Sequence, residues 1–306
     1  MNNKVVNWLI FILLSLIWGS SFILMLKGME RLSPFQLASL RIIFSGIVLL
    51  PVAIRKIKTV PSNKIFTIFL SGLLGSLIPA YLFCIAETKI DSSLVGSLNS
   101  LTPVFVLIIG ALFFSSKVSK IKALGILVSF IGSVLLILSH KDDVKNFDLL
   151  FLFLVILATI LYGLNVNMVG KYLGGIPSLD IAAIALATNA IPALIILLLV
   201  KGKIVNGVAG PSFFNDDFLS KEMLIASGYT FILGVLGTAF ASVIFYVLMK
   251  RAGIIFASMV TYAIPFVAVA WGIYLYNEQV GWKQIICLII ILSGVYLANR
   301  VQRDDA

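Results

Sequence analysis

The chain consists of apolar runs of about 20 residues joined by short polar segments, and few folds accommodate that pattern. A helix of this length spans the hydrocarbon core of a bilayer while satisfying its own backbone hydrogen bonds. Hydrophobic residues form 60% and charged residues 12% of the chain, whereas soluble domains have about 45–50% and 25%. We therefore predict an all-α integral membrane protein with ten transmembrane helices, at 6–27, 34–54, 64–86, 91–115, 121–139, 148–170, 178–200, 222–249, 255–276 and 283–300.

The same composition argues against several classes of protein. The net charge is +10, but the Lys and Arg residues fall in short clusters between apolar runs, which is typical of topology signals and not of a nucleic-acid-binding surface. One histidine, His140, and two cysteines within apolar runs, Cys84 and Cys287, do not make up the three or four ligands of a usual metal site. Within the predicted spans the sequence has no Ser–His pair and no cluster of acids and histidine. We expect no catalytic residues, no metal, no cofactor and no nucleic-acid partner, and the protein is not expected to be an enzyme.

Lys and Arg residues are more numerous in one set of alternate loops than in the other. If the N-terminus is inside, the clusters Arg55–Lys58, Lys117–Lys122 and Lys250–Arg251 are all cytoplasmic. Because short cytoplasmic loops are enriched in Lys and Arg, we predict a multi-pass protein of the bacterial inner (plasma) membrane with both termini cytoplasmic. The first span is longer than the roughly 7–15 apolar residues of a signal peptide, so we expect it to remain in the protein.

The chain also aligns with itself. At an offset of 162 residues, 69–135 match 231–297 without a gap, and upstream the offset is 144, so the difference falls near the linker 201–221. Corresponding positions are Trp18/Tyr162 and Ser21/Asn165 at the shorter offset, and Gly72/Gly234, Gly75/Gly237, Phe83/Phe245, Pro103/Pro265, Gly110/Gly272 and Gly132/Gly294 at the longer one. We predict two five-helix repeats, at 1–140 and 146–303. An odd number of spans inverts the second repeat relative to the first, and inverted repeats are typical of secondary transporters.

Three features carry a resemblance to a known family: Trp18–Phe22, the spans that contain Pro103 and Pro265, and Tyr276–Val280 followed by Ser293–Val295. In this order they resemble the EamA-type transporters of the drug/metabolite transporter superfamily, over essentially the whole chain. The resemblance implies ten helices, cytoplasmic termini, a central cavity between the two halves, and export of amino acids or other small metabolites.

Polar side chains within the spans are the candidates for binding a solute, because lipid cannot satisfy their hydrogen bonds. Some occupy equivalent places in the two repeats. The fourth and ninth spans each carry a proline after hydroxyl or amide side chains, and a proline inside a helix permits a kink, so we predict hinges at Pro103 and Pro265. The predicted substrate-binding residues are Trp18, Ser21, Asn99, Tyr162, Asn165, Thr261 and Tyr262. Packing between helices is the alternative role for these side chains.

Arg41 lies inside a span, where a midplane arginine costs about 2.5–3.5 kcal/mol on insertion scales. One interpretation is that it binds an anionic group of the substrate, such as a carboxylate or phosphate. The other is that it extends outward to Glu30 or Glu87 and anchors its helix. We favour the second interpretation because the repeat partner of Arg41 is Ala185 and the outer end of the span is near.

Acidic residues are missing from the middle of every predicted span. Proton relays usually place an acid or a histidine within the membrane, so a coupling proton would be carried near an interface, by Glu87 or Glu278. In the family that the sequence resembles, the first half usually has an acid where this chain has Ser116. Facilitated diffusion or substrate exchange fits the sequence equally well.

Together these features predict a secondary transporter that moves a small polar metabolite across the inner membrane by alternating access. An amino acid or related compound is the expected substrate, and export is the expected direction. An importer or permease for another metabolite, such as a nucleoside or a sugar, is the alternative, and an integral-membrane enzyme or a scaffold is a remote one. The expected partners are the small-molecule substrate and the lipid bilayer, and a homodimer is left open.

Overall fold

The structure, a computed structural model, describes residues 3–90, 92–116, 118–139, 149–199, 220–276 and 281–300, and every regular element within these ranges is helical. The first half contains α1 (Asn3–Met29), α2 (Pro34–Lys56), α3 (Ser62–Gly72), η1 (Leu73–Leu77), α4 (Ile78–Ala86), α5 (Ser92–Leu98), η2 (Asn99–Leu101), α6 (Thr102–Phe113) and α7 (Lys120–Ser139). The second half contains α8 (Leu149–Tyr172), α9 (Ser178–Leu199), α10 (Lys221–Ile232), η5 (Leu233–Phe240), α11 (Ala241–Ala252), α12 (Ile254–Ser258), η6 (Met259–Ala263), α13 (Ile264–Tyr276) and α14 (Trp282–Arg300).

A helix occupies each of the predicted spans. Within the described ranges, seven helical stretches are long and apolar enough to cross a membrane: Lys4–Met29, Pro34–Lys56, Ser62–Ala86, Leu94–Phe113, Leu149–Tyr172, Ser178–Leu199 and Lys221–Ala252. Two more apolar stretches, Ile254–Val267 and Trp282–Ala298, are shorter. Large apolar side chains such as Leu112, Phe113 and Leu199 are mostly exposed, which suits a surface covered by lipid. The chain is therefore a multi-pass membrane protein.

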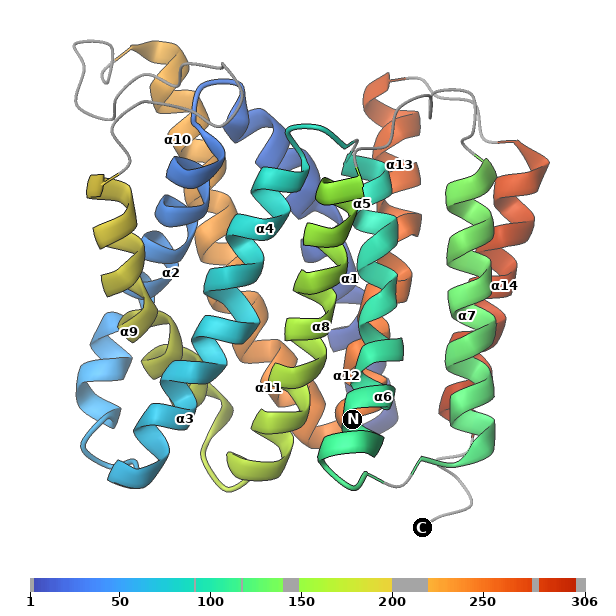
Figure 1. Cartoon of the computed structure of the whole chain (residues 1–306), viewed down its shortest axis with the longest axis horizontal. Coiled ribbons are helices and arrows are strands. Elements are labelled where there is room, and N and C mark those ends of the chain that lie inside the picture. Colours follow the sequence, from blue (N-terminus) through green and yellow to red (C-terminus); the bar gives the residue numbers. More distant parts are fainter. Residues whose placement is uncertain are drawn as a thin grey trace.

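The helices form a bundle in which α1 begins and α14 ends on the same side (Figure 1). At one edge of the bundle α7 packs against α14, and at the other edge α2 packs against α9. Each of these pairs joins helices that are equivalent in the two predicted repeats. Between the two pairs lie α1 and α8, with α4, α6 and α11 beside them.

Small residues allow the helices of each edge pair to approach closely. A Cβ atom at Gly125 of α7 would lie 2.7 Å from the Gly294 carbonyl oxygen, which is too close for any side chain. The Ser129 hydroxyl donates to the Ile291 carbonyl at 3.0 Å, so a side chain of α7 bonds directly to the backbone of α14. In the other pair, a Cβ atom at Gly46 of α2 would lie 2.9 Å from a carbonyl oxygen of α9. Both edges therefore depend on backbone-to-backbone contact.

Local sequence explains where several helices begin and end. At the start of α2, Ser33 accepts a hydrogen bond from the Gln36 amide at 3.2 Å, and Gln36 Oε1 accepts one from the Ser33 amide at 2.9 Å. This reciprocal cap, followed by Pro34, satisfies amides that have no partner within the helix. α11 ends at Gly253, whose φ of 90° suits glycine and lets the chain turn directly into α12.

Two spans in each half are interrupted at equivalent positions. The π-helical segments η1 and η5 interrupt the third and eighth spans, and the 3₁₀ segments η2 and η6 interrupt the fourth and ninth. The offset of 162 residues carries η1 into η5 and η2 into η6. Pro103 and Pro265 are the second residues of α6 and α13, where a missing amide costs no hydrogen bond. Such interruptions within a helix often mark functional sites.

Candidate functional site

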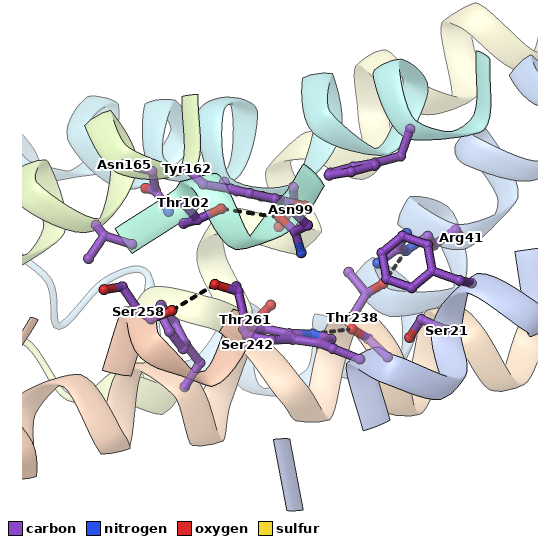
Figure 2. Close-up of a pocket in the computed structure, with 18 of the residues that line it drawn as sticks. Ser21, Arg41, Asn99, Thr102, Tyr162, Asn165, Thr238, Ser242, Ser258 and Thr261 are labelled. Atoms are coloured by element: carbon purple, nitrogen blue, oxygen red, sulfur yellow. Dashed lines mark hydrogen bonds between the residues drawn. The ribbon is translucent and has the colours of Figure 1, made fainter. Parts of the chain in front are cut away.

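A central cavity of about 100 Å³ lies between the two halves (Figure 2). Residues from all four of the interrupted spans line it. It is lined by Trp18, Ser21, Phe22, Met25, Arg41, Gly75, Ser76, Phe83, Asn99, Thr102, Tyr162, Asn165, Val166, Gly237, Thr238, Ser242, Phe245, Tyr246, Ser258 and Thr261. Ligand pockets for drug-sized molecules measure about 300–1,000 Å³. A cavity of this size therefore suits a compact solute.

The cavity wall repeats across the two halves. Most lining residues form pairs at the two offsets found in the sequence: Trp18/Tyr162, Ser21/Asn165, Phe22/Val166, Gly75/Gly237, Ser76/Thr238, Phe83/Phe245 and Asn99/Thr261. In each pair both members line the cavity. Arg41 is different, because its equivalent, Ala185, does not line the cavity.

Aromatic rings from opposite halves pack on each other around the cavity. Trp18 lies against Phe245 with ring centroids 5.3 Å apart, and the equivalent pair, Tyr162 and Phe83, has centroids 5.9 Å apart. The Trp18 indole nitrogen also donates to the Gly237 carbonyl at 3.1 Å. Each contact therefore contains one ring from each half. The aromatic walls join the halves and leave ring faces and edges for a solute.

Arg41 faces this cavity from α2. Its Nε donates to Thr238 Oγ1 at 2.7 Å, and its Nη1 lies 3.6 Å from the Met25 sulfur (Figure 2). The prediction that Arg41 extends outward to Glu30 was wrong, because Glu30 pairs with Lys27 at 2.7 Å and the Arg41 guanidinium faces the cavity, where it bonds to Thr238. The physical reason is that the π-helical turn of η5 brings a hydroxyl within reach of the guanidinium.

Asn165 lies at the other end of the cavity from Arg41 in Figure 2, and Asn99 lies between them. Asn165 is 4% exposed, and its Oδ1 has no hydrogen-bond partner among the described residues. A Cβ atom at Gly75 would clash with the Nδ2 atom of Asn165, so a side chain at position 75 would displace this amide. Asn99 Oδ1 accepts from the Thr102 hydroxyl at 3.1 Å, and the Thr261 hydroxyl donates to the Ser258 carbonyl at 3.0 Å. The free Asn165 oxygen can therefore accept a hydrogen bond from a solute.

The structure brings together six of the seven predicted substrate-binding residues and leaves out one. Tyr262 is fully buried outside the cavity, and its hydroxyl donates to the Ile126 carbonyl of α7 at 2.9 Å. The expectation that Tyr262 lines the cavity was therefore wrong, because the tight turn of η6 directs it toward α7. Pro103 and Pro265 are buried beside the cavity but do not line it. Glu87 is 7% exposed at the end of α4 and also does not line it, and Glu278 lies outside the described residues.

Several lining residues were not among the predicted site residues, and they include Thr238, Ser242, Tyr246 and Ser258. A sequence signal existed for Thr238, because it follows the matched Gly75/Gly237 pair and is equivalent to Ser76. The other three have equivalents in the first half that do not line the cavity, namely Ala80, Cys84 and Gly96. The repeat alone therefore gives no indication of their position.

A second, larger cavity of about 540 Å³ lies on the side where α1 begins and α14 ends. Val166 and Ser258 line the central cavity, and the next residues in the chain, Asn167 and Met259, line the second. Asn167 also holds α8 against α6, because its Nδ2 donates to the Val106 carbonyl at 2.9 Å. The charged residues on the wall of the second cavity are Lys122 and Lys250, and Lys250 donates to the Ile176 carbonyl. Over the described ranges, no three His, Cys, Asp or Glu side chains gather as metal ligands.

Comparisons with known proteins agree with the fold. The model of the EamA-like transporter family matches residues 6–138 and 149–300. An uncharacterized transporter of Archaeoglobus fulgidus is 23% identical over 299 residues, which cover 96% of this chain and 99% of that protein. Protein PagO of Salmonella typhimurium is 23% identical over 297 residues, with 96% and 93% covered. A solved crystal structure with 16% identity and a TM-score of 0.72 covers 98% of both chains and shows the same fold. These matches identify a membrane transporter and not an enzyme, and the chain belongs to the EamA-like transporter family.

Proposed function

We propose that the protein is a secondary carrier of the bacterial inner membrane that exports a small polar metabolite, an amino acid or a related compound, by alternating access. The observation that carries this proposal is the central cavity, whose wall is built from equivalent residues of the two halves. A site shared by two halves can be exposed to either side when the halves exchange conformations. The small volume of the cavity supports a compact solute over a nucleoside.

The proposed architecture is ten transmembrane helices in two inverted repeats, 1–140 and 146–303, with a linker at 201–221. Two observations support it. The family model matches the chain in two separate segments, and the π and 3₁₀ interruptions recur at one offset in both halves. Their proximity to Pro103 and Pro265 supports hinges at the fourth and ninth spans.

Alternating access also requires a path from the site to one side of the membrane. The second cavity supplies a candidate path, because consecutive residues of α8 line the two cavities and the second one lies on the side of the chain ends. We propose that this side is cytoplasmic. Single cysteines are introduced at Lys56 and Lys89 in variants lacking Cys84 and Cys287. In intact cells a membrane-impermeant maleimide should label the cysteine at 89 and not the one at 56. Labelling of the cysteine at 56 in place of the one at 89 would reverse the orientation.

Counterflow in proteoliposomes tests the transport function. Vesicles containing the purified full chain are preloaded with one unlabelled compound, and uptake of the labelled compound is measured for amino acids, organic acids, nucleosides and sugars. We expect exchange of an amino acid or related compound, and no exchange in protein-free vesicles. Exchange of nucleosides or sugars alone would contradict the proposed substrate, and failure of the whole set with folded protein would contradict carrier function.

A pH gradient imposed on the same vesicles tests coupling. If a proton is carried, uptake rises with the gradient, and Glu87→Gln or Glu278→Gln abolishes that rise while leaving exchange without a gradient intact. If uptake is the same with and without the gradient, the protein is an exchanger or a facilitator, and the two acids have no coupling role.

A further inference from the structure

We propose that the central cavity binds an organic anion whose carboxylate pairs with the Arg41 guanidinium. This rests on the proposed transport function and narrows its substrate to compounds that carry a carboxylate, so uncharged nucleosides and sugars are excluded. Arg41 is the one charged side chain among the described residues that line the cavity. A guanidinium within a membrane protein is costly, and here it faces a space that a solute can enter.

The partners of Arg41 on the protein are neutral. Of the five N–H groups of a guanidinium, Nε–H donates to Thr238 and one on Nη1 points to the Met25 sulfur. Three N–H groups, including both on Nη2, therefore have no hydrogen-bond partner among the described residues. Arginine binds a carboxylate through parallel N–H groups, and such charge-assisted bonds are the strongest of their kind. The free part of the guanidinium thus matches a carboxylate better than a hydroxyl or an amide.

Thr238 is a positioning residue for this site. Its hydroxyl accepts from Arg41 Nε at 2.7 Å and donates to the Leu233 carbonyl at 3.2 Å, five residues back in the chain. A carbonyl five residues back is the partner that a π-helical turn offers, so η5 orients the hydroxyl and the hydroxyl orients the guanidinium. A guanidinium held in one orientation loses less entropy when an anion binds.

The neighbouring cavity has the same sign of charge. Its charged lining residues within the described ranges are Lys122 and Lys250, both cationic. A solute that passes between this cavity and the central one therefore meets positive charge at both stages, which raises the local concentration of anions. Both lysines lie on the side of the chain ends, and Arg41 lies deeper, beside the aromatic walls.

The rest of the central cavity suits the body of such a solute. Trp18, Tyr162, Phe83 and Phe245 offer aromatic surface on the cavity wall. Asn165 offers a hydrogen-bond acceptor at the end away from Arg41 (Figure 2). A compact carboxylate with an apolar or aromatic body and a hydrogen-bond donor therefore matches the wall along its whole length.

The test uses benzoate and benzamide, which have nearly the same shape and differ in charge. Binding of each compound to the purified full chain in detergent is measured by isothermal titration calorimetry for the wild type and for Arg41→Gln, Arg41→Lys and Thr238→Val. Lys56→Gln is the matched control, because it removes one positive charge from the same helix at an exposed position outside both cavities. Size-exclusion elution confirms that each variant is folded.

We expect the wild type and Lys56→Gln to bind benzoate at least about tenfold more tightly than benzamide. Arg41→Gln should remove that preference, Arg41→Lys should weaken it, and Thr238→Val should weaken benzoate binding severalfold without changing benzamide binding. If Arg41→Gln does not fold, the other two variants decide the result. Equal binding of the two compounds by the wild type, undetectable benzoate binding, or unchanged preference in the Arg41 and Thr238 variants would overturn the proposal.

Transport and anion binding fail in different ways. Arg41-dependent benzoate binding without any counterflow would contradict the carrier and leave the anion site intact. Counterflow of uncharged solutes, with no preference for benzoate, would contradict the anion site and leave the carrier intact.

Discussion

The two halves of the chain line the same cavity from equivalent positions, yet they do not contribute equivalent chemistry. Trp18 and Tyr162 are both aromatic, as are Phe83 and Phe245, and each ring of one half packs on a ring of the other. Arg41 in the first half has Ala185 as its equivalent in the second, and the wall is charged at one place only.

This difference separates two requirements of a carrier. Rings, small residues and interrupted turns recur in both halves, and these features determine the shape of the cavity and the approach of the helices. The Arg41 guanidinium occurs in the first half only, and the hydroxyls of Ser242 and Tyr246 occur in the second half only. Both halves therefore contribute to the shape of the cavity in the same way, whereas its charge and several of its polar groups come from one half alone.

The largest expected effect concerns the shared packing. A Cβ atom at Gly72 would lie 2.7 Å from the Ala185 carbonyl oxygen, and one at Gly234 would lie 2.8 Å from the Arg41 carbonyl oxygen. Gly72→Val and Gly234→Val should each lower the free energy of unfolding by about 1–3 kcal/mol, because both overpack the same kind of helix contact. Unfolding in mixed micelles of increasing SDS content measures this. Gly228→Val is the control, since nothing lies within 4 Å of its Cβ position.

If only one of these two glycine variants is destabilised, the packing of the two halves is not equivalent. A loss of stability in the Gly228→Val control as large as in the other two would show that valine itself, and not the contact, is responsible.

The next effect distinguishes two asparagines on one helix. Asn167 donates to the Val106 and Gly163 carbonyls, whereas the Oδ1 of Asn165 has no partner among the described residues. Asn165→Leu should reduce counterflow by about tenfold, which corresponds to 1.4 kcal/mol, with no loss of thermal stability. Asn167→Leu should lower the free energy of unfolding by about 0.6–1.7 kcal/mol and keep most counterflow per folded protein. The opposite pattern would assign Asn165 to packing.

A smaller effect is expected at the aromatic contacts. Phe83→Leu and Phe245→Leu each remove one ring from a pair, and aromatic pairs contribute about 0.5–1.5 kcal/mol beyond their buried area. Both variants should slow counterflow to a similar extent, by no more than about tenfold. Leu112→Ala, at an exposed position outside the cavity, is the control. A large effect at one phenylalanine and none at the other would show that the solute contacts one aromatic wall only.

The smallest effect is expected for the indole nitrogen of Trp18. Trp18→Phe keeps a ring but removes the bond to the Gly237 carbonyl, and hydrogen bonds between membrane helices contribute about 0.6 kcal/mol on average. The melting temperature should fall slightly, and Tyr162→Phe at the equivalent position should leave it unchanged. A fall of many degrees in Trp18→Phe would mean that this bond stabilises the contact between the halves far more than an average one.

The sequence was sufficient for the helices, because hydropathy alone locates apolar runs and each predicted span contains a helix. It was also sufficient for much of the cavity wall. Equivalent positions such as Ser21/Asn165 and Asn99/Thr261 line the same cavity. Aligning the two repeats of the sequence reveals such pairs without any knowledge of packing.

The direction of Arg41 could not be predicted in this way. It depends on Thr238, which is 197 residues away and reaches Arg41 through a π-helical turn that hydropathy does not reveal. The position of Tyr262 had a similar origin, because its partner is a carbonyl on α7, 136 residues away. Both errors concern side chains whose partners are distant in sequence, and their polarity alone did not indicate which neighbour they would find.

The π-helical segment η5 has a mechanical consequence. An α-helix advances by about 100° per residue, because 3.6 residues complete a turn, and a π turn holds one residue more. If the eight residues of η5 tightened to α-helical hydrogen bonding, α11 would rotate about its own axis by about that angle relative to α10. Ser242 and Tyr246 would then leave the cavity wall together, and the Thr238 hydroxyl would lose its place beside the guanidinium. A rotation confined to one helix would thus weaken the binding site without any gate closing over it.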